Sequence, residues 1–206
     1  MVGQSEANLR AVIQTAEAIA PCCLWIDELE KGFAGSKGSG STDGGASARV
    51  FGSFLSWMQE KTKPVFIVAT ANDVSQLPPE MLRKGRFDEL FFVDLPNEAE
   101  RESIWRLVIR KQRRDPIDYE VRQLARASAE FTGAEIEAVY LAAMFAGFER
   151  QKEPTDLDIA VALNETVPLS RLMAEQIAAL KQWAKGRARS ATQAPPTSLA
   201  TRKLVV

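Results

Sequence analysis

Two adjacent carboxylates follow an apolar run near the start of the chain. The run reads CCLWI, and Asp27 and Glu28 come directly after it. Such a run is typical of a buried strand, and a carboxylate that leaves water is destabilised unless it is paired or binds a metal ion. The pair therefore favours a site for a cation and a polarised water molecule. The dipeptide alone fits a core strand that ends in an acidic turn or helix cap equally well.

A second apolar run, at residues 65–69, continues into the sequence TAND, which places Asn72 just beyond it. Helical patterns are expected at 5–20 and 47–61, and a third strand at 90–95. Strands that alternate with helices form a parallel sheet with right-handed crossovers, and ligands bind beyond the carboxyl ends of its strands. We therefore expect Asp27, Glu28 and Asn72 to converge at one edge of the sheet.

A stretch rich in glycine, serine and alanine occupies residues 32–45. Its GSKGSG segment does not fit a phosphate-binding loop, because Lys37 is followed by glycine and no strand leads into the segment. We interpret the stretch as a flexible loop.

Composition narrows the class of protein. The chain has 206 residues, of which 46% are apolar and 26% charged, and a net charge of -1, which gives no clear nucleic-acid signal. The absence of histidine leaves carboxylates, amides and cations for any catalysis. Adjacent Cys22 and Cys23 favour packed thiols in a reducing compartment. No apolar run approaches the ~20 residues of a membrane span, and residues 1–6 do not resemble an export signal, so we expect the cytoplasm or the plastid stroma.

From residue 97 onward the pattern is helical. Asn97 and Glu100 form a predicted capping box at the start of the first helix. Further helices are expected at 118–127, 132–150, 155–163 and 171–185. Beyond Gly186 the sequence has no periodicity and is expected to be disordered. The predicted organisation is an α/β part at 1–96, a helical part at 97–169, a C-terminal helix at 170–185 and a disordered tail at 186–206.

Five motifs occur in one order along the chain, namely WIDELE, IVATAND, MLRKGRFDE, FTGAEIEA and PTDLDIAVAL. In this order and spacing the chain resembles the AAA (AAA+) family of ATPases over residues 2–184, and it is most similar to the uncharacterised AAA proteins of cyanobacteria and algal plastids. The resemblance implies an α/β fold, with an incomplete P-loop NTPase-type parallel sheet and helices followed by an AAA helical lid bundle.

The resemblance also implies roles for the acidic residues and the amide. Asp27 matches the Walker B acid that positions Mg²⁺ through water, and Glu28 matches the acid that orients the lytic water at the γ-phosphate of ATP. Asn72 matches the sensor amide that helps to hold the same water. Considered alone, an asparagine after a strand is equally typical of a turn.

Two further motifs carry implied roles. Arg83 and Arg86 match the arginine fingers that reach into the nucleotide site of a neighbouring subunit. The alternative interpretation of these two residues is a solvated basic turn. Gly133 and Ala134 match the place where the AAA lid approaches the nucleotide with its backbone; small residues there also fit a tight helix start.

The family's phosphate loop, which ends in Gly-Lys-Ser or Gly-Lys-Thr, has no counterpart in this sequence. The resemblance places the missing first strand between 65–69 and 90–95, so a gap in the sheet is expected. Two hypotheses follow. The first is an ATPase that binds ATP and Mg²⁺, assembles into a ring, which the resemblance implies is hexameric, and remodels an unknown macromolecule. The alternative is a catalytically inactive truncated subunit that docks on full-length AAA partners. We expect the chain to be the C-terminal part of a longer ATPase.

Overall fold

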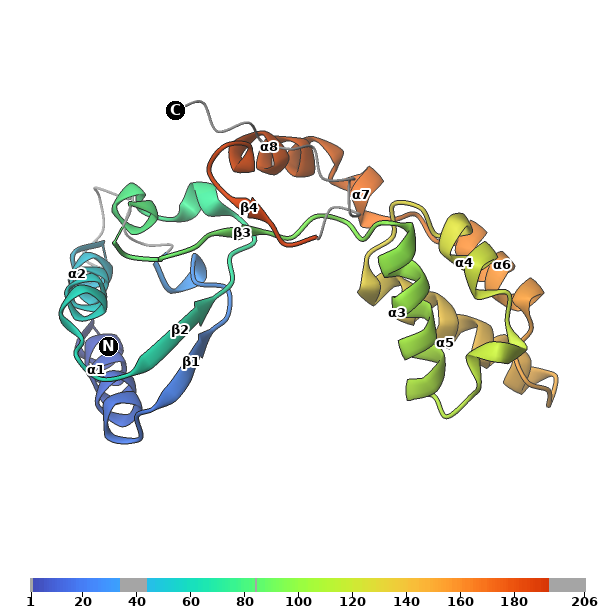
Figure 1. The fold of residues 1–206 in the computed structure, drawn as a ribbon, viewed down its shortest axis with the longest axis horizontal. Helices are drawn as coiled ribbons and strands as arrows, with labels where there is room; N and C mark the ends of the chain where they lie inside the picture. Colours follow the sequence, from blue (N-terminus) through green and yellow to red (C-terminus); the bar gives the residue numbers. More distant parts are fainter. Residues whose placement is uncertain (1, 34–43, 84, 193–206) are drawn as a thin grey trace, which may run out of the picture. The chain divides into compact units, whose positions relative to one another are not determined.

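The computed structural model describes residues 2–33, 44–83 and 85–192 (Figure 1). The chain forms two compact units, Met1–Leu90 and Phe91–Val206. The division falls six residues before the predicted start of the helical part at residue 97, because a short strand that follows Leu90 pairs within the second unit. The predicted glycine-rich segment at 35–40 and the part of the predicted tail at 193–206 lie outside the described residues.

The first unit combines a small parallel sheet with helices. Its elements are α1 (Val2–Ala18), β1 (Cys22–Ile26), the 3₁₀ turn η1 (Lys31–Phe33), α2 (Gly44–Glu60), β2 (Val65–Ala69), and the 3₁₀ turns η2 (Val74–Gln76) and η3 (Pro79–Leu82). β1 and β2 pair in parallel from Cys22 with Val65 to Ile26 with Ala69. Both strands lie where the sequence predicts them, and the parallel pairing is confirmed.

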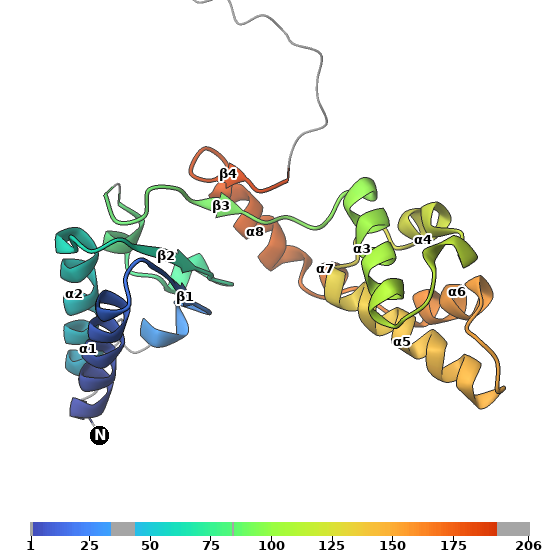
Figure 2. The same cartoon turned by 60° about the horizontal axis from the view of Figure 1, so that its bottom comes forward.

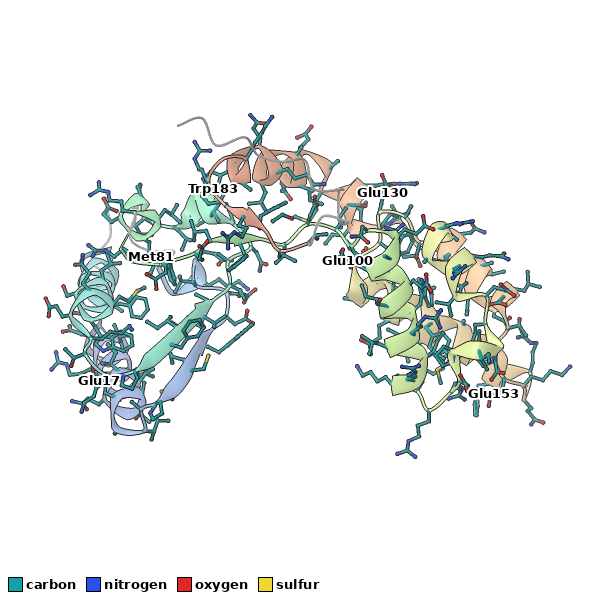
Figure 3. All side chains as sticks on the ribbon, in the orientation of Figure 1. Glu17, Met81, Glu100, Glu130, Glu153 and Trp183 are labelled. Carbon is teal, nitrogen blue, oxygen red and sulfur yellow. The ribbon has the colours of Figure 1, made fainter. Side chains whose placement is uncertain are left out.

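The core of this unit lies between the strands and the two long helices. Figures 1 and 2 show α1 and α2 side by side along one side of the strands. Phe54 and Met58 of α2 pack there with Ile26 and Ile67 from the sheet. Met81 of η3, labelled in Figure 3, is fully buried in the same cluster. These contacts hold the ends of β1 and β2 at a defined position.

Within the first unit, exposed side chains lie on the other face of the sheet. The exposed fractions of Trp25 and Phe66 are 62% and 70%, and Cys23 is also exposed. The prediction of a buried first strand is therefore wrong for Cys23 and Trp25, whereas Cys22 is half-buried and both cysteines are free thiols, as expected. The physical reason is that alternate residues of a strand point to opposite faces, and α1 and α2 cover only one of them.

The second unit is mainly a helical bundle. Its elements are β3 (Phe91–Phe92), α3 (Glu98–Lys111), η4 (Pro116–Asp118), α4 (Val121–Ala127), α5 (Gly133–Glu149), α6 (Asp156–Glu165), α7 (Leu169–Leu172), α8 (Ala174–Ala184) and β4 (Arg189–Ser190). Trp105, Ile136, Tyr140 and Ile159 are fully buried in a core built from α3 to α6. The capping box predicted at Asn97 is present, and its bonds fix the start of α3.

The third strand differs from the prediction. It spans only Phe91–Phe92, and it pairs in parallel with Arg189–Ser190, a partner that was not predicted. Its separation from the sheet of β1 and β2 fits the expected gap. This pairing also gives local structure to a part of the segment after Gly186 that is expected to be disordered. The backbone N–H of Ala191 donates to the carbonyl oxygen of Phe92 at 2.9 Å, which adds one bond beyond the strand pair.

Among the helices of the described residues, none combines the length and the hydropathy needed to cross a membrane.

Candidate functional site

Thr70, the residue that follows β2, contacts the end of β1 through four hydrogen bonds. Its N–H donates to the carbonyl oxygen of Ile26 at 2.9 Å, and its carbonyl oxygen accepts from the N–H of Leu29 at 2.9 Å. Its hydroxyl accepts from the N–H of Glu28 at 3.0 Å and donates to Oδ1 of Asp27 at 2.5 Å. Both acidic residues are therefore held by the same residue of the neighbouring strand end.

Glu28 carries two polar contacts on its carboxylate. The side-chain amide of Asn72 donates to Oε1 at 3.3 Å, and the Nζ of Lys31 lies 2.6 Å from the carboxylate. The structure thus brings Asp27, Glu28 and Asn72 together at one sheet edge. The hydrogen bond to Glu28 raises the pKa of Lys31. Lys31 is therefore charged at neutral pH and provides a cation for an otherwise acidic cluster.

The backbone of Glu28 is unusual, because its φ of 50° lies in the left-handed region. A residue with a Cβ atom is disfavoured there by about 1–2 kcal/mol. Such conformations persist where the surroundings fix them, and they are found frequently at functional sites. The bonds from Glu28 N–H and Leu29 N–H to Thr70 supply that fixation.

Glu30 is a third carboxylate in the same turn. It is only 6% exposed, and its Oε1 accepts from the backbone N–H of Asn72 at 3.1 Å. Its Oε2 is buried without a hydrogen-bond partner among the described residues. Glu30 therefore ties the turn after β1 to the turn after β2.

Sequence reasoning missed three contributors to this site. Thr70 and Glu30 lie inside the IVATAND and WIDELE motifs, and Lys31 follows directly. The signal that could have identified them is that they lie close to Asn72 or Glu28 in the sequence. A pattern of residue types does not say which hydroxyl or carboxylate is turned toward its neighbour.

A small cavity of about 130 Å³ lies beside the acidic pair. Asp27 and Glu28 line one part of it, and the remaining lining residues are Leu9, Ile26, Leu29, Gly32 and Phe54. A water-sized or slightly larger group can therefore approach the carboxylates from this side.

The described residues contain no group of three or more His, Cys, Asp or Glu side chains arranged to hold a metal ion. Mg²⁺ is commonly held by one or two carboxylates, waters and substrate phosphates. Asp27 is exposed at the strand end, which fits a water-mediated contact of this kind. The donor set fits Mg²⁺ only together with phosphate oxygens, and the sequence has no Gly-Lys-Ser or Gly-Lys-Thr loop to hold those.

Arg83 and Arg86 follow η3. Arg83 is exposed, whereas Arg86 is half-buried and its Nε has no hydrogen-bond partner among the described residues. The backbone N–H of Arg86 donates to the carbonyl oxygen of Arg83 at 3.3 Å, so the two belong to one turn. In the part of the chain that the structure describes, neither guanidinium contacts the acidic cluster.

Gly133 and Ala134 begin α5 in the second unit. Thr132 caps this helix, and its hydroxyl accepts from the N–H of Glu135 at 3.3 Å. Burial opposes ionisation of Glu135, but hydrogen bonds from Thr132 and from the N–H of Leu169 outweigh it and lower the pKa of this carboxyl. The start of α5 is therefore a firmly fixed helix terminus.

Gly133 also lines a pocket of about 950 Å³ that lies wholly within the second unit. Its other lining residues include Asp94, Pro96, Thr132, Ile177 and Leu180. Lys181 of α8 forms an ion pair with Asp94 at 2.8 Å, which connects two parts of this unit. Ala134 is exposed.

Comparison with known proteins places these features in a family. Residues 1–95 match the description "ATPase family associated with various cellular activities (AAA)". The chain is 47% identical over 194 residues to the "Uncharacterized AAA domain-containing protein ycf46" of Pyropia yezoensis, with 93% of this chain and 39% of the relative covered. Relatives of the same name from Trieres chinensis (93% and 39% covered) and Guillardia theta (89% and 36% covered) are each 46% identical. The chain thus spans about two fifths of the length of these relatives.

A solved structure shows the same fold. The AAA domain of FIGL-1, in complex with ADP, matches with a TM-score of 0.72 and 18% sequence identity, over 90% of this chain and 64% of that chain. At that identity the similarity shows the α/β fold with its parallel strands and helical region. This chain is therefore an AAA domain protein, close to the uncharacterised AAA proteins of algal plastids and similar to part of their length.

Proposed function

We propose that this chain carries the water-activating part of the nucleotide site of an AAA-type ATPase. The observation that supports the proposal is the hydrogen-bonded cluster at the ends of β1 and β2, in which Glu28 contacts the amide of Asn72 and Asp27 is fixed by Thr70. A carboxylate beside an amide is suited to orient water, because the amide donates where the carboxylate accepts.

In this proposal each residue has one task. Asp27 would hold Mg²⁺ through water, and the metal ion would offset the negative charge of the phosphoryl group of ATP. Glu28 accepts a hydrogen bond from the attacking water, and Asn72 holds that water in line. Lys31 pairs with the Glu28 carboxylate and provides a positive charge beside it.

The arginines act between subunits in this proposal. Arg83 is exposed and Arg86 is half-buried, so at least the Arg83 guanidinium is accessible to another chain. Guanidinium groups carry a permanent charge and a planar fork that match phosphate oxygens. We propose that copies of the protein assemble into a ring, six-membered as is usual for the family, in which these arginines reach the neighbouring nucleotide.

The start of α5 is the proposed contribution of the helical unit. Gly133 exposes its backbone to the 950 Å³ pocket, and an ideal Cβ atom there would come no closer than 3.7 Å to the side chain of Ile104. The space in front of this backbone is therefore open to a ligand. We propose that Gly133 and Ala134 approach the nucleotide with their backbone, and that hydrolysis drives the remodelling of a macromolecule in the cytoplasm or plastid stroma.

A second candidate is a non-catalytic subunit that docks on full-length AAA proteins. One observation favours it: Trp25 and Phe66 leave an apolar sheet face exposed. Exposed apolar faces of this kind mark interaction sites or association-prone surfaces.

The two candidates are separated by ATP turnover in an extended protein, defined as this chain joined to the sequence that precedes the matched region in the Pyropia yezoensis relative. The ATPase proposal predicts Mg²⁺-dependent release of phosphate by the extended protein and none by the 206-residue chain alone, which serves as the matched control. A folded extended protein without turnover would favour the docking subunit.

A further inference from the structure

The four hydrogen bonds of Thr70 fall into two classes. The bonds to Ile26 and Leu29 use the backbone of Thr70, so any residue at this position would make them. The bonds to Asp27 and Glu28 use the hydroxyl. Only a residue with a β-hydroxyl, threonine or serine, has one short group that donates and accepts at the same place.

The hydroxyl fixes the backbone of Glu28. With a φ of 50°, Glu28 is in a conformation that a residue with a Cβ atom rarely adopts unless it is held. Its N–H has Thr70 Oγ1 as acceptor at 3.0 Å. Without that acceptor, the N–H of Glu28 loses its partner in a half-buried turn, and the direction of the carboxylate is less well defined.

The same hydroxyl fixes the side chain of Asp27. Because the Thr70 hydroxyl accepts from Glu28, its proton is directed to Oδ1 of Asp27. An exposed aspartate normally samples several rotamers, and a short bond to a rigid strand end selects one of them. One hydroxyl therefore sets the relative positions of both carboxylates.

We propose that Thr70 is a positioning residue for the acidic pair, acting through its hydroxyl rather than through its packing. The expected effect of Thr70 on ATP turnover rests on the proposed function. Its geometric role, which is to fix the positions of Asp27 and Glu28, does not. Thr70 does not touch the reacting atoms, and its effect reaches them through Asp27 and Glu28.

Amide hydrogen exchange on the 206-residue chain tests the geometric part. Thr70→Val keeps the shape of the side chain and removes the hydroxyl, and we expect exchange of the Glu28 amide to accelerate by about tenfold or more. The Leu29 amide is the internal control, since it is bonded to the backbone of Thr70 and should keep its rate. Thr70→Ser should restore slow exchange at Glu28.

A matched control is available in the same unit. The hydroxyl of Thr15 donates to the carbonyl oxygen of Ala11 within α1 at 2.8 Å, and Thr15→Val should leave the Glu28 amide unchanged. An unchanged Glu28 amide in Thr70→Val would overturn the proposal. Equal acceleration at Glu28 and Leu29 would also overturn it, because that pattern indicates general loosening of the strand end.

Turnover by the extended protein tests the catalytic part. Thr70→Val should lower kcat for ATP by about tenfold or more, leave KM nearly unchanged, and be rescued by Thr70→Ser. An unchanged kcat, or a raised KM alone, would contradict a positioning role. If the extended protein shows no turnover, the proposed function fails, and the exchange result by itself decides the role of Thr70.

Discussion

The buried carboxylate of Glu30 accepts a hydrogen bond from the backbone N–H of Asn72 at 3.1 Å, so the turn after β1 is tied to the turn after β2. The bond joins residues 42 positions apart in the sequence. It lies beside the contact between Glu28 and the Asn72 side chain, and it fixes the backbone from which that side chain extends.

Removal of this acceptor should destabilise the first unit. Glu30→Ala leaves the Asn72 N–H without its partner, and we expect the free energy of unfolding to fall by about 1–3 kcal/mol. Glu30→Gln keeps an acceptor oxygen and removes a buried negative charge, so its loss should be smaller. Urea unfolding followed by circular dichroism measures both. Equal losses in the two variants would show that the bond to Asn72 is not what Glu30 contributes.

Two glycines of α5 should respond in opposite ways to alanine. A Cβ atom at Gly147 would lie 2.8 Å from the carbonyl oxygen of Lys152 and 2.9 Å from the nitrogen of Pro154, both backbone atoms that cannot move aside freely. Overpacking of this kind costs about 1–3 kcal/mol, whereas alanine gains about 1 kcal/mol over glycine in helix propensity. We therefore expect Gly147→Ala to lower the free energy of unfolding of the helical unit. Thermal unfolding measures the change.

Gly133→Ala is the matched control for that variant. Its new Cβ would be in ordinary contact with Ile104 at 3.7 Å, so stability should be unchanged or slightly higher. A stability loss at Gly133 as large as that at Gly147 would contradict the packing described for the start of α5.

Asp158 should contribute an acid-dependent part of the stability of the helical unit. The hydrogen bond from Arg150, with further bonds from Thr155, lowers the pKa of Asp158 to about 2. Because the folded-state pKa is lower than the unfolded value of about 3.9, the contribution is complete above pH 4 and is lost as the pH falls toward 2. Asp158→Asn should therefore flatten the stability profile between pH 4 and 2, as measured by urea unfolding at each pH. An unchanged slope would contradict the role of this ion pair.

The exposed sheet face should make the chain prone to association. Replacing Trp25 and Phe66, which are 62% and 70% exposed, by threonine keeps β propensity and removes apolar surface. We expect less binding of a hydrophobic dye and less self-association in analytical ultracentrifugation, with little change in stability. The comparison variant is Leu107→Thr, which removes an exposed side chain of the helical unit. Equal effects from both changes would show that the sheet face is not special.

The sequence predicts the positions of the helices and strands better than it predicts which of their side chains are buried. A local signal such as the capping box at Asn97 depends on residues within one turn of helix, and the structure confirms that helix start. The exposure of Trp25 could not be predicted in the same way. An apolar strand residue is buried only if something covers its face, and that depends on elements distant in the sequence.

The site shows the same limit. The motif spacing brings Asp27, Glu28 and Asn72 to one sheet edge, where the structure places them. The hydroxyl of Thr70 was not predicted, because its role depends on a hydrogen-bond direction and on the left-handed backbone of Glu28. The pairing of Phe91 with Arg189 was missed because two-residue strands carry no periodic signal.

The central claim is that Glu28 activates water for ATP hydrolysis, and turnover by the extended protein with Glu28→Gln tests it most directly. Glutamine keeps the size and the contact to Asn72 but cannot act as a base, so we predict that ATP and Mg²⁺ still bind while kcat falls by about 10² to 10⁴. Glu17→Gln is the control, because Glu17 accepts from the indole of Trp57 at 2.7 Å in the same unit, away from the acidic cluster. Normal turnover with Glu28→Gln would contradict the account.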